Sequence, residues 1–143
     1  MSTNVVSATT IKRDWHLVDA ANQPLGRIAT GIAKFLMGKH KINYVPYLDA
    51  GDYVVITNAK AVKLTGKKSD QKIYTYHSGY PGGLRQESFA SMIVRHPEEV
   101  IRHAIWGMVP KGRQGRAMIK RLKIFVGSQH PYAKNFKKEE VNG

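Results

Sequence analysis

The sequence predicts a single α/β domain whose sheet is mainly parallel and has about four strands. The first observation behind this prediction is the order strand, helix, strand within residues 15–57, because such a unit joins two neighbouring parallel strands. The second is the run YVVIT at residues 53–57, which is typical of a strand buried on both faces. The third is size, since 143 residues, 42% of them hydrophobic, suffice for one hydrophobic core.

The first strand and the first helix follow from side-chain shape and spacing. Bulky and β-branched side chains at residues 15–19 predict the strand. Pro24 suits the first position of a helix, and Gly38 suits its end. Between them, apolar residues recur at helical spacing: Leu25, Ile28, Ala29, Ile32, Ala33 and Leu36. We therefore expect an amphipathic helix that leads to the strand at 53–57.

The rest of the chain supplies further elements of the same domain. They are a strand at 72–76, a loop at 77–83, helices at 88–94, from Pro97 to about residue 107 and at 113–122, and a closing strand at 124–126. We expect one domain at residues 13–131, a flexible basic lead-in at 1–12 and a C-terminal tail at 132–143.

The net charge indicates a polyanionic partner. The chain carries 23 Lys and Arg against 10 Asp and Glu, a formal charge of +13. Such a domain repels itself, and nucleic acid is the first candidate to relieve this, ahead of an anionic membrane surface. The sequence has no cysteine, which excludes disulfides and thiolate chemistry. Without a secretory signal or an apolar run of about 20 residues, a cytoplasmic location without membrane insertion is the expectation.

Motifs that would indicate an enzyme are incomplete. The turn after the first strand holds only Gly26, so the three-glycine dinucleotide fingerprint is missing. The segment at 65–69 resembles a phosphate loop, but Ala61 stands where its upstream glycine is required. The six histidines include no pair at helical ligand spacing, and Asp49 and Asp52 are typical of a self-capping turn. We predict no catalytic residue, metal ligand, cofactor or small-molecule substrate.

The last third of the chain is the strongest signal for nucleic-acid binding. Residues 100–138 hold ten Lys or Arg and no Asp or Glu, whereas a solvated surface usually mixes both signs. If residues 113–122 are helical, Arg113, Arg116 and Lys120 fall within about 60° of one another, with apolar residues opposite. We therefore expect this face to contact phosphates, with arginine forming forked hydrogen bonds.

A second basic cluster precedes the glycine-rich loop. It consists of Lys60, Lys63, Lys67, Lys68 and Lys72. Glycines in the loop permit close backbone approach, and four rings nearby can stack on bases: Tyr74, Tyr76, His77 and Tyr80. Packing of the same tyrosines on their own sheet is the alternative for each ring.

A set of short segments, in order and at fixed spacing, carries a resemblance to a known family. The most specific are HSGYPGG at 77–83 and GMVPKG at 107–112. The others are residues 15–20, 25–29, 38–41, 51–55, 58–59, 65–68, 115–116, 122–124 and 130–131. With these the sequence resembles the ribosomal protein L-thirteen family of the bacterial large subunit, except in its ending at 132–136.

The resemblance implies a three-layer α/β/α domain of Rossmann-like topology without a dinucleotide site. It also implies a structural protein, not an enzyme, that binds large-subunit ribosomal RNA directly, early in assembly and beside other large-subunit ribosomal proteins. A nucleoid-type DNA-binding protein is the alternative, and a nucleotide-using enzyme is supported only by fold analogy. The residues expected to contact RNA are Arg27, Lys39, Lys41, Lys67, Lys68, Lys72, His77, Gly79, Tyr80, Arg85, Lys111, Arg113, Arg116, Lys120, Arg121 and Lys123.

Overall fold

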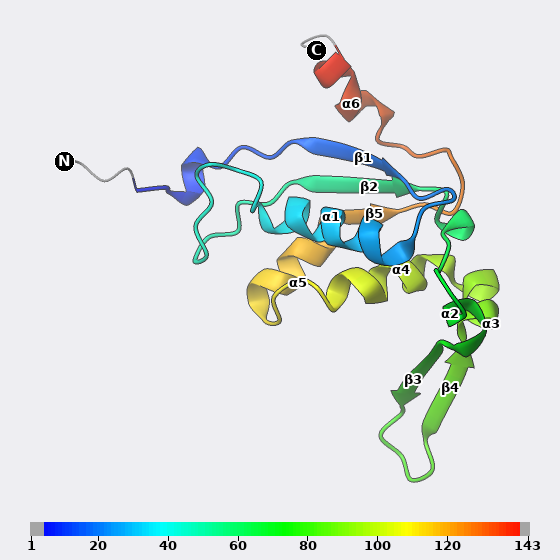
Figure 1. Ribbon diagram of the computed structural model, residues 1–143. Helices are drawn as coiled ribbons and strands as arrows, with labels where there is room; N and C mark the ends of the chain where they lie inside the picture. The colour runs from blue at the N-terminus through cyan, green and yellow to red at the C-terminus, as the bar shows by residue number, and fades with distance from the viewer. Residues whose placement is uncertain (1–4, 141–143) are drawn as a thin grey trace.

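The computed structural model describes residues 5–140, and the side chains of residues 5–136. Its elements in chain order are the 3-10 helix Ala8–Thr10, β1 Trp15–Asp19, α1 Leu25–Met37, β2 Tyr53–Thr57, the 3-10 helix Ala59–Ala61, α2 Lys68–Gln71, β3 Ile73–His77, β4 Leu84–Ser88, α3 Phe89–Arg95, α4 Pro97–Trp106, α5 Arg113–Lys120, β5 Leu122–Ile124 and α6 Ala133–Glu140. The mixed α/β class is as predicted, and Figure 1 shows helices beside the sheet of β1, β2 and β5, with the β3–β4 hairpin apart from it.

The main sheet is parallel and has three strands in the order β1-β2-β5. Strand β2 is central, because Tyr53 pairs with Trp15 of β1 on one side and Val54 pairs with Leu122 of β5 on the other. The strand–helix–strand unit is confirmed, since α1 connects β1 to its parallel neighbour β2. The closing strand begins at Leu122, two residues before the predicted start, because this buried leucine pairs with Val54. Helix α5 consequently ends at Lys120.

The strand predicted at 72–76 does not join the main sheet. It forms β3, one residue later, and pairs antiparallel with β4 in a separate hairpin. Figure 1 shows this hairpin projecting away from the body of the molecule. Its residues are mostly exposed, and Tyr74 is the one fully buried side chain of β3. The main sheet therefore has three strands, not about four, since the polar strand β4 (LRQES) supplies the partner of β3.

Helix α1 places its predicted apolar face in the core. All six apolar residues expected on that face are buried, and Met37 joins them. The helix begins at Leu25, with Pro24 as its N-cap, and ends at Gly38. Gly38 takes a left-handed φ of 82°, and its N–H donates to Lys34 O. A side chain there would also meet the backbone of Ala50, so this turn requires glycine.

The two faces of the main sheet are covered differently. Buried residues of α1 and α4 pack with Val54 and Ile56 in the core on one face. The other face carries aromatic side chains, where Trp15 stacks on Tyr53 at a centroid distance of 4.4 Å. Tyr132, just before α6, stacks on the same indole at 5.1 Å. Figure 1 accordingly shows α6, which the sequence did not predict, on the side of β1 opposite α1.

Candidate nucleic-acid interface

Helix α5 presents a cationic face that its apolar side holds in place. Arg113, Arg116 and Lys120 are exposed, as predicted, while Met118 lies in the core with 3% of its surface exposed. Gly115 is buried so tightly that a Cβ would overlap the carbonyl oxygen of Pro110. The helix therefore cannot turn about its axis, and its three cations stay on the solvent side.

Two further predicted residues flank this helix. Lys111 is exposed just before it, and its Nζ lies 5.6 Å from the ring centroid of Trp106, a cation–π contact. Lys123 follows on β5, pairs in register with Val55 and is half-buried. We name the exposed group Lys111, Arg113, Arg116 and Lys120 the α5 face.

The β3–β4 hairpin presents aromatic rings and cations at its tip and base. Tyr80 is 76% exposed, whereas Tyr74 is buried near His103 on α4 and is removed from any surface role. The turn is held by its own hydrogen bonds, from Ser78 N to Gly83 O and from Gly79 N to His77 Nδ1. These bonds fix the loop, and the ring of Tyr80 is offered to solvent.

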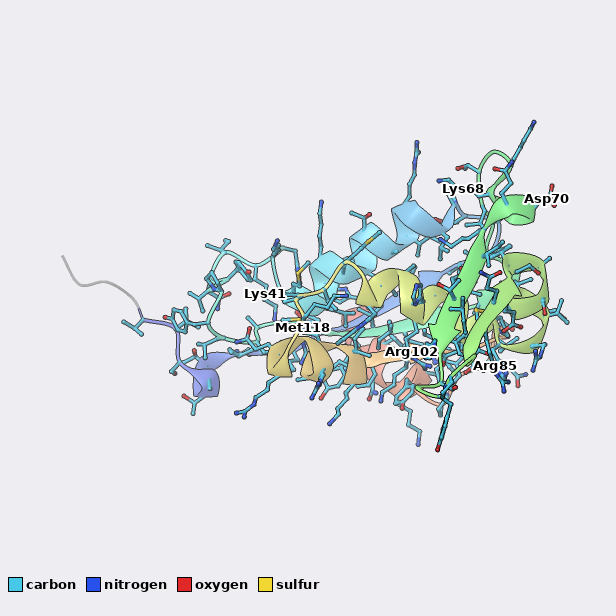
Figure 2. The ribbon with its side chains drawn as sticks, turned by 90° about the horizontal axis from the view of Figure 1, so that it is seen from below. Lys41, Lys68, Asp70, Arg85, Arg102 and Met118 are labelled. Atoms are coloured by element: carbon cyan, nitrogen blue, oxygen red, sulfur yellow. The ribbon has the colours of Figure 1, made fainter. Side chains whose placement is uncertain are left out.

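Cations lie beside the hairpin and on it. Lys67 and Lys68 are exposed at the start of α2, ahead of β3, and Arg85 on β4 pairs across the hairpin with Tyr76. Figure 2 shows Lys68 and Arg85 on separate projecting segments. Lys72 is half-buried, with its Nζ 5.4 Å from the Tyr74 ring centroid. The exposed residues of this group, Lys67, Lys68, His77, Gly79, Tyr80 and Arg85, form what we name the hairpin surface.

Two of the residues expected to contact RNA are engaged inside the protein instead. Arg121 is 7% exposed, forms a forked pair with the carboxylate of Asp49 and donates to Leu36 O at 2.9 Å. The Nζ of Lys41 lies 2.7 Å from Asp52 Oδ1 and 2.6 Å from Lys12 O. Their charges are satisfied internally, so we leave both out of the interface.

The buried carboxylate of Asp52 is contacted by groups from two other segments, residues 14–16 and 40–41. Its side chain has no exposed surface, and the Nε2 atoms of His16 and His40 each lie 2.8 Å from Oδ2. Lys41 and the backbone N–H of Asp14 reach Oδ1. Because an ionised carboxylate only accepts hydrogen bonds, both Nε2 atoms carry a proton. We name these residues the Asp52 cluster; nothing in their sequence spacing indicated it.

The donor atoms of His16, His40 and Asp52 are also close enough together to surround a metal ion. The ammonium of Lys41 lies 2.7 Å from the same carboxylate, however, and neutralises its charge without a metal ion. Both imidazoles pack on the ring of Phe35, at centroid distances of 4.1 and 5.2 Å. The cluster is therefore a structural anchor that joins β1, the end of α1 and the segment before β2.

The electrostatics of the Asp52 cluster favour the ionised acid. Burial alone would raise the pKa of Asp52, but hydrogen bonds from His16, Lys41 and Asp14 N, with the charge of Lys41, outweigh it. The pKa of Asp52 consequently lies well below its ordinary value of 3.8. The folded state thus binds this proton less readily than the unfolded chain does.

Acid is therefore expected to destabilise the protein through Asp52. A lowered pKa contributes stability that is complete above the ordinary value of 3.8 and is lost as the pH falls below it. Urea unfolding between about pH 6 and pH 2.5 should show this decline. The variant Asp52→Asn should start less stable and decline less steeply, and parallel declines of the two proteins would contradict the assignment.

Arg27 and Lys39 complete the predicted set. Both are exposed, at opposite ends of α1 and apart from the α5 face in sequence. Lys34, on the same helix and also exposed, was not predicted. Its spacing of seven residues from Arg27 returns to the same side of a helix, so the signal was present in the sequence. In the described part of the chain, no helix combines the length and apolar character needed to cross a bilayer.

Comparison with known proteins gives one consistent result. The family model described as Ribosomal protein L13 matches residues 13–131. A protein of Roseiflexus castenholzii named Large ribosomal subunit protein uL13 is 50% identical over 133 residues, 93% of this chain and 91% of that protein. Proteins of the same name from Thermotoga petrophila and Aeromonas salmonicida are each 52% identical, over 91% and 93% of this chain and 87% and 94% of their own lengths. These matches cover the fold and the basic surfaces described above, and the chain therefore belongs to the ribosomal protein L13 family.

Proposed function

We propose that this chain is a structural constituent of the large ribosomal subunit that binds large-subunit ribosomal RNA directly, in the cytoplasm. The observation that carries the proposal is the α5 face, whose cations are exposed while the helix beneath them is fixed to the core. Its relatives are named as large-subunit ribosomal proteins and not for any reaction, which supports a binding role instead of catalysis.

The α5 face and the hairpin surface suit different parts of an RNA. Fixed guanidinium and ammonium groups pair with phosphates and release counterions, which gives affinity without reading sequence. Exposed rings such as Tyr80, at the end of a projecting hairpin, suit unpaired bases that stack on aromatic side chains. Folded RNA offers both features, whereas regular duplex DNA offers only the first, so RNA is favoured over the nucleoid-type alternative.

A role in early assembly and contacts with neighbouring ribosomal proteins belong to the same proposal. Cations fixed on a folded core are pre-organised, so the protein binds RNA without first ordering a segment of its own. Such a protein is suited to join an RNA that is still folding and to hold two of its segments together.

The fold proposal is a three-layer, Rossmann-like α/β/α arrangement within residues 13–131, between a lead-in at 1–12 and a tail at 132–143. Support for it comes from the parallel order β1-β2-β5, with α1 and α4 on one face. Helix α6 and the rings around Trp15 contribute to the second face.

Salt dependence of binding tests the proposed mechanism. If the seven exposed cations of the two surfaces contact phosphate, the logarithm of the binding constant should fall with that of the salt concentration at a slope of about −5 to −6. Fluorescence anisotropy with a large-subunit RNA fragment, repeated across salt concentrations, measures this slope. A slope near zero would contradict phosphate binding.

Competition distinguishes the two kinds of nucleic acid. Structured large-subunit RNA should displace a bound RNA fragment at far lower concentration than duplex DNA of the same length does. Equal displacement by the two would favour the nucleoid-type alternative over the proposed function.

A further inference from the structure

Two adjoining hollows run along the exposed side of α1. One, of about 560 Å3, lies between the first turns of α1 and residues 64–68, and Arg27, Thr30, Leu64 and Lys68 are among the residues that line it. The other, of about 420 Å3, lies at the far half of the helix and includes Lys34, Lys39 and Met108. Thr30 lines both, so the hollows meet at the middle of the helix.

Cations succeed one another along these hollows. Lys68 and Arg27 stand at one end, and Lys34 and Lys39 stand at the other. Figure 2 shows Lys68 at the end of the molecule where α1 begins. Arg27 and Lys34 are seven residues apart, which places them on one side of the helix about 10 Å apart along its axis. We name the row Lys68, Arg27, Thr30, Lys34 and Lys39 the α1 trench.

The floor of the α1 trench is apolar. Leu64 lines one hollow and Met37 the other, and Met108, 41% exposed, contributes its thioether. The hydroxyl of Thr30 lies 3.7 Å from the sulfur of Met108, so Met108 lies over the middle of the helix. No acidic residue is among the described residues that line either hollow. The surface thus combines a positively charged rim with an apolar floor.

We propose that a single-stranded segment of RNA lies along the α1 trench, with its phosphates on the cations and its riboses and bases on the apolar floor. This inference rests on the proposed function and adds to it a separate site for an unpaired strand, on α1. A duplex keeps its bases stacked and paired inside, so only its backbone would meet this surface. An unpaired strand has free base faces, and these match the hollows with Leu64 and Met108 beneath them.

Binding of a short oligonucleotide to the full chain tests the inference. The probe is a labelled, unstructured single-stranded RNA of about eight nucleotides, within the usual range of single-strand site sizes. The trench variant carries Arg27→Gln, Lys34→Gln and Lys39→Gln, all at exposed positions. Its affinity for the probe should fall at least about tenfold, and its salt slope should be less negative by about 2, since each single-strand phosphate contact contributes about 0.7.

A variant of equal charge serves as the control. Arg95→Gln, Arg102→Gln and Lys134→Gln also remove three charges, from positions outside the α1 trench, the α5 face and the hairpin surface, and should change probe affinity by less than about threefold if the probe occupies the trench. Equal losses in the two variants, or no binding of the probe by the unaltered protein, would overturn the inference. Urea unfolding of both variants checks that each remains folded.

Two further measurements separate this inference from the proposed function. With a structured large-subunit RNA, the α5 variant, which carries Arg113→Gln, Arg116→Gln and Lys120→Gln, should lose affinity even where probe binding fails, so the two proposals can fail independently. Photocrosslinking of a 4-thiouridine probe, followed by peptide mapping, should mark peptides that contain Met37, Leu64 or Met108. Crosslinks confined to α5 or to the hairpin would overturn the trench assignment.

Discussion

Replacement of Asp52 by alanine is expected to lower the free energy of unfolding by about 3–5 kcal/mol, the range for breaking a buried ion pair from one side. The carboxylate is fully buried and accepts from His16, His40 and Lys41. Its removal leaves the ammonium of Lys41, whose side chain is only 15% exposed, without its counter-charge, and leaves two imidazole N–H groups without an acceptor. Urea or thermal unfolding followed by circular dichroism measures the loss.

Asp70→Ala is the matched control for this substitution. Asp70 is also an aspartate, but it is exposed in the short helix α2. Surface substitutions of this kind change stability by about 0.5 kcal/mol or less. Equal, small effects of Asp52→Ala and Asp70→Ala would show that the Asp52 cluster does not stabilise the protein in solution.

The variant with Arg113→Gln, Arg116→Gln and Lys120→Gln is expected to bind large-subunit RNA about a hundredfold more weakly. Each lost charge-assisted contact is worth roughly 1 kcal/mol or more, and three together reach this factor. The salt slope should become less negative by about 2 to 3. Stability should stay within about 0.5 kcal/mol of the unaltered protein, because all three side chains are exposed.

A control variant with the same loss of charge shows whether position matters. Arg95→Gln, Arg102→Gln and Lys134→Gln also remove three cations, but none of them belongs to the α5 face, and Arg95 and Arg102 are paired with Glu87 and Glu99. We expect its affinity to fall by less than about threefold if contact, not total charge, governs binding. Equal losses would mean that RNA senses only net charge. Unfolding of the α5 variant would mean that its substituted face is packed and not free.

Much of the fold was predictable because its signals are local. The apolar spacing of α1, the β-branched run of β2 and Pro97 at the start of α4 depend on neighbouring residues alone, and the structure confirms each. The hairpin was not predictable in the same way. Strand β4 is polar and exposed, so its conformation depends on pairing with β3, and no periodicity marks it. Helix α6 is similarly inconspicuous without the Trp15 ring beside it.

In the interface, too, the features with local signals were predictable and those set by distant contacts were not. Helical spacing alone predicted the exposed cations of α5, and the same argument would have found Lys34 on α1. Charge could not show which cations are already paired: Arg121 reads as one of a basic run, yet its partner Asp49 lies 72 residues earlier. A contact over such a separation is set by the tertiary fold, and the shorter Lys41–Asp52 pair depends on the turn that brings the end of α1 to the start of β2, so neither pairing can be predicted from spacing along the chain.

The order of strands in the main sheet also bears on how the chain is made. Strand β2 lies between β1 and β5, but 64 residues separate Thr57 from Leu122. At synthesis rates of about 5–20 residues per second, the ribosome needs roughly 3 to 13 seconds to add that stretch. For most of this interval the β5 side of β2 has no strand to pair with, and α4, which packs with α1 in the core around Val54 and Ile56, is still being added. The rate of translation thus sets how long the nascent chain exposes this unpaired strand edge.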